Sequence, residues 1–189
     1  MSRSTFKNTT EALYETGWYG GMPENAKAWG IIADGATDDA AEAFGVAVSV
    51  CESPIETLLL AGLLSVQYPH RKCRSPGVRM PDGTAINANA PIQIFPQMRL
   101  GRYRLDFMVV AERKGEAPTM VNVECDGHEF HQDVTMVQWN ADRDRDAYVR
   151  SLGHMVKRFP GSEIWRDPTG CADDVAALVS QRRAINGGK

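Results

Sequence analysis

Three carboxylates lie close together in two consecutive segments of β-strand character. Asp106 belongs to the segment Tyr103–Val110, and Glu124 and Asp126 lie at the end of the segment Met120–Asp126. Side chains at positions i and i+2 of a strand share a face, so we expect Glu124 and Asp126 to point together. Mg²⁺ prefers carboxylate and water oxygens, and a bound metal can polarise a phosphodiester and lower the pKa of a bound water. The pattern predicts a site for a divalent metal ion.

The two segments are separated by Glu112–Pro118, which is short enough for a hairpin centred on residue 115. Opposed residue numbers then sum to about 230, which places Asp106 opposite Glu124, with Cβ atoms about 4.5–5.5 Å apart. A one-residue bulge would shift this register. Alternation along the first segment predicts a core face formed by Tyr103, Leu105, Phe107 and Val109. The opposite face is formed by Arg104, Asp106, Met108 and Val110.

The alternative for each carboxylate is exposure to solvent or an ion pair with Arg104. For a single carboxylate that alternative is the better one. Three converging carboxylates in an otherwise apolar strand context favour a metal site, because like charges at this spacing repel one another.

A series of short motifs accompanies these carboxylates. The central part reads Gly101-x-Tyr103-Arg104-x-Asp106-Phe107, followed by Glu124-x-Asp126-Gly127-x-x-x-His131. The flanking parts are Ser53-Pro54-Ile55-Glu56, Gln97, Asp142-x-x-Arg145-Asp146, Leu152-Gly153 and Arg158-Phe159. In order and spacing they resemble the PD-(D/E)XK nuclease superfamily, which is restriction-endonuclease-like. The resemblance is nearest to the branch that includes very-short-patch-repair endonucleases, and it covers residues 53–160.

The resemblance implies roles for particular residues. Asp106 and Glu124 would hold Mg²⁺ or Mn²⁺, and Glu56 would approach the metal from the preceding helix while also serving as a capping residue. Asp126 stands where the superfamily usually has lysine, although some members carry an acidic residue there, so the site gains a carboxylate and loses a cation. The catalytic residues expected are Asp106, Glu124, Asp126, His131 and Glu56, and the metal ligands Asp106, Glu124 and Asp126.

His128 and His131 follow the second segment, and a histidine near a metal-bound water is a plausible general base because its pKa is near neutrality. The family pattern keeps a histidine at position 131, which makes His131 the candidate, whereas His128 fits a surface position equally well. Zinc binding by Cys125 and the two histidines is disfavoured, because alternation turns Cys125 to the face opposite Glu124. The four cysteines form no Cys-x-x-Cys pair, so neither a disulfide framework nor a four-cysteine zinc site is indicated.

The elements that position these residues alternate along the chain. Ser53, Pro54 and Glu56 form a capping box that begins a buried helix, residues 68–90 resemble a long basic loop, and a second helix is expected from about Thr37 to Cys51. Strands are expected at Ile92–Met98, Tyr103–Val110, Met120–Asp126 and Met155–Phe159, with helices at Met136–Leu152 and Asp173–Arg183. The predicted fold is α/β, a mixed four-stranded sheet flanked by helices, in which an antiparallel three-strand meander is joined by one parallel strand. The chain should divide into a helical extension, residues 1–52, and a nuclease-like domain, residues 53–189.

The formal net charge is -3, but the acidic excess lies in residues 1–50, and residues 51–189 carry a net charge of +1. Basic clusters suit phosphate contacts, although such clusters are often only solvated surface. The residues expected to contact DNA are Arg71, Lys72, Arg74 and Arg145. The first three belong to a basic cluster that also contains His70 and Arg79.

The sequence therefore favours a metal-dependent endonuclease acting on DNA. Two alternatives stay open: a catalytically silent nucleic-acid-binding or interaction domain that has lost the lysine, and a nuclease acting on RNA or branched DNA. No apolar run approaches the roughly 18–20 residues of a membrane span. The first residues lack the apolar stretch of a secretory signal, so a cytoplasmic location is expected.

Overall fold

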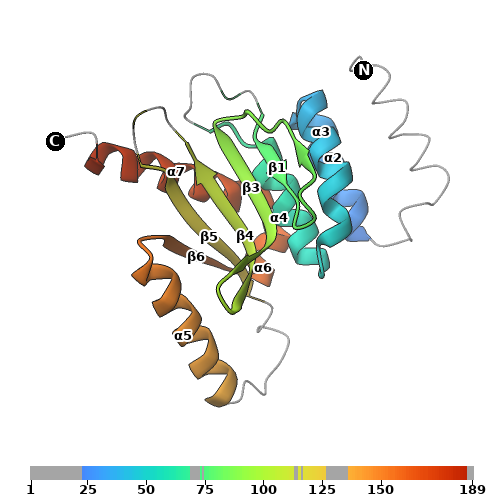
Figure 1. Ribbon diagram of the computed structural model, residues 1–189. Coiled ribbons are helices and arrows are strands. Elements are labelled where there is room, and N and C mark those ends of the chain that lie inside the picture. Colours follow the sequence, from blue (N-terminus) through green and yellow to red (C-terminus); the bar gives the residue numbers. More distant parts are fainter. Residues whose placement is uncertain are drawn as a thin grey trace.

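The computed structural model describes residues 23–68, 73, 75–112, 115, 117–126 and 136–186, without the side chains of residues 23–26, 136–140 and 180–186. A mixed sheet with helices on both faces forms the centre of the fold (Figure 1), so the protein is α/β as the sequence predicts. None of the described helices combines the length and apolar character that a membrane crossing requires.

The sheet has six strands in the order β2-β1-β3-β4-β5-β6. Their bounds are β1 Gly77–Arg79, β2 Ala85–Ile86, β3 Ile92–Leu100, β4 Tyr103–Ala111, β5 Thr119–Asp126 and β6 Met155–Pro160. The predicted count of four is wrong, because β1 and β2 lie in the segment that the sequence analysis treated as a loop. Strands of two and three residues are too short to show an alternating pattern.

The predicted meander and parallel strand are confirmed. β3, β4 and β5 pair antiparallel, and β6 joins β5 in parallel after a crossover through α5, Met136–Ser151. The β4–β5 register places Phe107 opposite Val123 and Met108 opposite Asn122. This is the register expected for a hairpin centred on residue 115.

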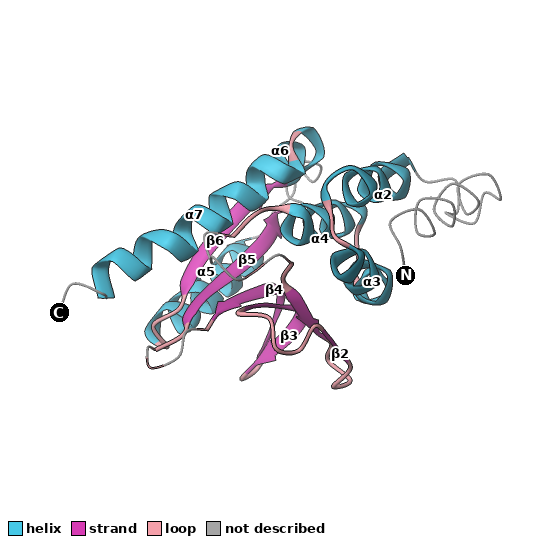
Figure 2. Cartoon of the chain, turned by 90° about the horizontal axis from the view of Figure 1, so that it is seen from above, coloured by secondary structure: helices cyan, strands magenta, loops and turns pink. Residues whose placement is uncertain are grey.

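One face of the sheet is covered by helices α4, Pro54–Ser65, and α7, Pro168–Asn186, which lie together on one side of the strands in Figure 2. Helices α2, Pro23–Gly35, and α3, Asp38–Ala47, add Ile32 and Phe44 to the same core. A short 3-10 helix, Val48–Val50, follows α3, and α6, Gly161–Arg166, precedes α7. The boundary proposed at residue 52 stays a prediction.

The opposite face carries a smaller core, in which Leu105, Met108 and Val110 of β4 pack with Val149 of α5. The sequence analysis assigned Leu105 to the same face as Phe107, and this assignment is wrong. Gln97 of β3 has a φ of 52°, and the β3–β4 pairing skips it between Pro96–Phe107 and Met98–Leu105. Alternation along β4 is therefore broken at Asp106, which would otherwise pair with Gln97, and Leu105 turns toward α5; Tyr103 also packs against this smaller core.

Candidate active site

Asp106 lies where β4 and β5 begin to separate. The last β4–β5 pair is Phe107 with Val123, and the same register carried one step further brings Asp106 beside Glu124. The Oδ2 atom of Asp106 accepts a hydrogen bond of 2.8 Å from the backbone N–H of Cys125. The carboxylate thus replaces a backbone partner at the point where the two strands diverge, and its position is fixed by the sheet.

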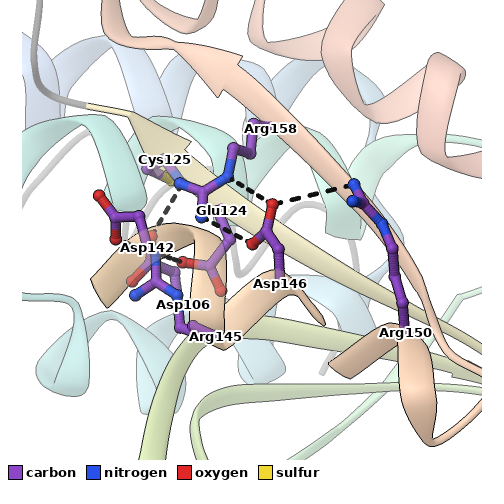
Figure 3. Close-up of polar contacts among 8 residues, drawn as sticks. All are labelled: Asp106, Glu124, Cys125, Asp142, Arg145, Asp146, Arg150 and Arg158. Atoms are coloured by element: carbon purple, nitrogen blue, oxygen red, sulfur yellow. Dashed lines mark hydrogen bonds and ion pairs between the residues drawn. The ribbon is translucent and has the colours of Figure 1, made fainter. Parts of the chain in front are cut away.

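Glu124 is the more deeply buried carboxylate, with only 2% of its side chain exposed. Its Oε2 atom forms an ion pair of 2.9 Å with Arg145 of α5, which also bonds Oδ1 of Asp142 at 3.0 Å. Figure 3 shows Asp106 and Glu124 on neighbouring strands with the Arg145 guanidinium beside them. The Oε1 atom of Glu124 is buried and has no hydrogen-bond partner among the described residues.

The environment favours the protonated form of both acids. Burial, together with the charge of Asp106, raises the pKa of Glu124 to about 7, although the nearby Arg145 acts in the opposite direction. Burial also raises the pKa of Asp106, where the Cys125 hydrogen bond acts in the opposite direction and the charge of Glu56 adds to the rise. Two neighbouring buried acids whose pKa values are both raised form a pair that a cation would stabilise in its charged form.

Glu56 performs the capping role expected from the sequence. Ser53 is the N-cap of α4, and its hydroxyl accepts from the Glu56 N–H and donates to Glu56 Oε1. The Oε2 atom of Glu56 accepts hydrogen bonds from the Glu52 N–H and from the amide of Gln97, at 2.9 and 2.8 Å. Gln97, which the resemblance named without a role, therefore connects α4 to the strand position opposite Asp106.

A second arginine lies near the carboxylate pair. Arg158 of β6 stands beside Glu124 in the parallel β5–β6 register and bonds both oxygens of Asp146 on α5, at 2.7 and 3.3 Å. Its charge lowers the pKa of Glu124 and of Asp106. From the sequence, Arg158 belonged to the family pattern and was one of several possible phosphate contacts, but its place beside Glu124 could not be predicted, because the sequence does not fix the register between β5 and β6.

The described part of the chain contains no group of three histidine, cysteine or acidic side chains arranged to hold a metal ion. The strand register brings Asp106 and Glu124 together, and the metal-binding roles expected for Asp106, Glu124 and Asp126 stay predictions. Asp126 lies at the end of β5 opposite Pro160. Arg104, the alternative partner considered for these carboxylates, forms its ion pair with Glu52 instead.

The carboxylate pair nevertheless fits a hard divalent cation. Mg²⁺ is often bound by one or two carboxylates, with waters and substrate phosphate oxygens completing an octahedral shell. The unpartnered Oε1 atom of Glu124 is a buried oxygen of the kind such an ion requires. His131, Arg71, Lys72 and Arg74 lie outside the described residues, so their predicted roles stay predictions.

Comparison with known proteins assigns the family. The model of the restriction-endonuclease-like family REase_MTES_1575 matches residues 85–179, about half of the chain. The chain belongs to the REase_MTES_1575 family. The match begins at β2 and ends within α7, so it contains Asp106, Glu124, Arg145 and Arg158. No curated protein and no solved structure matches the chain.

Membership in the REase_MTES_1575 family supports the PD-(D/E)XK superfamily that the motifs resemble. It indicates a nuclease and implies a nucleic-acid substrate.

Proposed function

We propose that the protein is a metal-dependent endonuclease that hydrolyses phosphodiester bonds in DNA. The observation that carries the proposal is the buried carboxylate pair, in which Glu124 keeps one oxygen without a partner among the described residues. The two acids stand at the point where β4 and β5 diverge, within the segment that the family match covers. We also propose that, within the superfamily, the protein is nearest to the very-short-patch-repair endonucleases.

Asp106 and Glu124 would hold Mg²⁺ or Mn²⁺. When bound, such an ion would polarise the scissile phosphate and assist attack by water. Asp106 presents its carboxylate in a fixed direction because the Cys125 N–H binds one oxygen. Burial of Glu124 beneath α5 limits the water that competes for it, which strengthens its electrostatic interactions.

Arg145 and Arg158 would provide the positive charge that the superfamily usually obtains from the lysine at the position of Asp126. Both arginines already lower the pKa of Glu124. Arg145 is 21% exposed and can contact solvent and the carboxylate together, so its guanidinium suits a phosphate that enters beside Glu124. We propose His131 as the general base, and Arg71, Lys72 and Arg74 as further phosphate contacts.

The test is a substrate screen with the full chain. Supercoiled plasmid, linear duplex, mismatched duplex, single-stranded DNA and RNA are each incubated with Mg²⁺, Mn²⁺ or EDTA, and products are resolved on gels. Cleavage of DNA that EDTA abolishes supports the proposal. Cleavage of RNA alone selects the ribonuclease alternative, and binding without cleavage of any substrate selects the catalytically silent domain.

A further inference from the structure

A pocket of about 500 Å³ opens between the β3–β4 turn and helix α5, outside the carboxylate site. It is lined by Arg102, Tyr103, Asp144, Ala147 and Tyr148. Pockets for small organic groups have volumes of a few hundred Å³ and combine aromatic walls with a few polar groups. No role assigned above to the carboxylate pair uses any of these five residues.

Two tyrosines form the aromatic part of the pocket. The rings of Tyr103 and Tyr148 lie with centroids 5.4 Å apart and a tilt of 47°, and 37% of Tyr148 is exposed. The guanidinium of Arg102 lies 4.9 Å from the centre of the Tyr103 ring. Exposed aromatic rings together with arginine are the groups on which unpaired nucleobases stack.

Gly101 lies against the side chain of Tyr148. The glycine has a φ of 59° in the β3–β4 turn, and a Cβ atom at this position would lie 2.7 Å from the Tyr148 hydroxyl. The positive φ favours glycine, and the absence of a side chain leaves room for the Tyr148 hydroxyl beside the turn. Gly101 and Tyr103 of the sequence motif therefore both lie against Tyr148.

The pocket and the carboxylate pair share two elements. Tyr103 precedes Asp106 by three residues on β4, a distance of about 10 Å along the strand. Tyr148 follows Arg145 by three residues on α5, which is nearly one helical turn. A strand whose phosphate lies at the carboxylate pair would pass the pocket within a few nucleotides.

We propose that this pocket binds an unpaired nucleobase of the nucleic-acid substrate, stacked on Tyr148 and Tyr103. The inference rests on the proposed function for the identity of the substrate. Asp144 disfavours a phosphate in the pocket and can accept a hydrogen bond from the exocyclic amino group of adenine, cytosine or guanine. Thymine has no such group, so the pocket should prefer an amino-bearing base. Arg102 would contact the adjoining phosphate.

The test measures base stacking separately from cleavage. The full chain is titrated in EDTA into a short single-stranded oligothymidine that carries one 2-aminopurine, whose fluorescence is quenched when it stacks. The wild-type protein should bind and quench. Tyr148→Ala should weaken binding roughly five- to 150-fold, the range that corresponds to the loss of one base–aromatic stack. It should also remove the quenching. Tyr148→Phe keeps the ring and should retain both signals.

A matched control and a second variant complete the design. Trp165 on α6 is another exposed aromatic, 41% exposed, and Trp165→Ala should change neither affinity nor quenching. Asp144 is exposed, so Asp144→Ala should fold normally, and because alanine has no hydrogen-bond acceptor it should reduce the preference for oligodeoxyadenosine over oligothymidine. Circular dichroism verifies the fold of each variant.

The outcomes separate the pocket from the nuclease. The proposal that the pocket binds a base would be refuted if the wild type failed to quench the probe, or if Tyr148→Ala quenched it as strongly as the wild type. Either result holds whether or not the protein cleaves DNA. An unchanged base preference in Asp144→Ala would rule out the hydrogen bond from the amino group to Asp144. If quenching depends on Tyr148 but the protein cleaves no substrate, base binding by the pocket is supported and the proposed function is refuted.

Discussion

The guanidinium of Arg145 on α5 lies 2.9 Å from Oε2 of Glu124 on β5. The acid is only 2% exposed and the arginine 21%, so the ion-pair partner of the buried Glu124 comes from a helix that packs on the sheet through Val149. A cation bound at Glu124 would compete with Arg145, because both would neutralise the same carboxylate. The free energy of unfolding of the metal-free protein therefore measures how strongly Arg145 stabilises the charged Glu124.

Removing Arg145 should leave the buried Glu124 carboxylate without its ion-pair partner. Arg145→Ala should lower the free energy of unfolding by about 2 kcal/mol at pH 8 in EDTA, less than the roughly 3–5 kcal/mol for fully buried pairs because the arginine is partly exposed. In a Glu124→Gln background the same substitution should cost much less. Urea denaturation of the four proteins measures the coupling.

Arg150→Ala is the matched control on the same helix. Arg150 is 61% exposed and lies 3.8 Å from Asp146, so its loss should change stability by less than about 0.5 kcal/mol. Equal losses for Arg145→Ala with and without Glu124 would mean that the two side chains are not coupled.

The raised pKa of Glu124 predicts how stability depends on pH in EDTA. Its folded pKa is about 7 and its ordinary value 4.5, so the folded protein binds this proton more tightly than the unfolded chain. The contribution is fully present below pH 4.5 and is lost as pH rises toward and through 7. Glu124→Gln should flatten this decline, whereas Glu42→Gln, at an exposed position on α3, should preserve it. A decline that is identical in all three proteins would exclude Glu124 as its source.

The paired strands show which features the sequence could predict. The register of β4 and β5 followed from the length of one hairpin loop, and the start of α4 followed from Ser53 and Glu56, because both depend on local spacing. The broken alternation at Asp106 could not be predicted, since it depends on the positive φ of Gln97 on the neighbouring strand. The short strands β1 and β2 are stabilised by pairing with β3 rather than by a pattern of their own.

The candidate site was predicted in part for the same reason. Asp106 and Glu124 come together through one hairpin. The ion pair between Arg145 and Glu124 requires α5 to pack across the sheet, and spacing along the chain contains no signal for that packing. From the sequence, Arg145 was accordingly predicted to contact phosphate, with a salt-bridged helix face as the alternative, and its pairing with Glu124 was not predicted.

His131 follows β5 in the sequence and lies outside the described residues. If it accepts a proton from the attacking water, His131→Ala should slow cleavage by roughly 10²–10⁴-fold. Metal affinity, measured by calorimetry, should stay nearly unchanged. A normal cleavage rate in this variant would remove His131 from the mechanism.

The basic segment before β1 is expected to bind phosphates. Replacing Arg71, Lys72 and Arg74 together with alanine should make the slope of log affinity against log salt shallower by up to about 3 for duplex DNA, at about 0.9 per phosphate contact. Binding is measured in Ca²⁺ to avoid turnover. An unchanged slope would show that DNA is bound elsewhere on the surface.

The most direct measurement compares DNA cleavage by the wild type, Asp106→Asn and Glu124→Gln in Mg²⁺ and in Mn²⁺, with Glu42→Gln as control. Each site variant removes a negatively charged oxygen ligand while preserving the size of the side chain, so the fold should survive. The account predicts metal-dependent cleavage by the wild type and the control, and no detectable cleavage by either site variant. Full activity in Asp106→Asn or Glu124→Gln, or a wild type that cleaves equally well in EDTA, would contradict it.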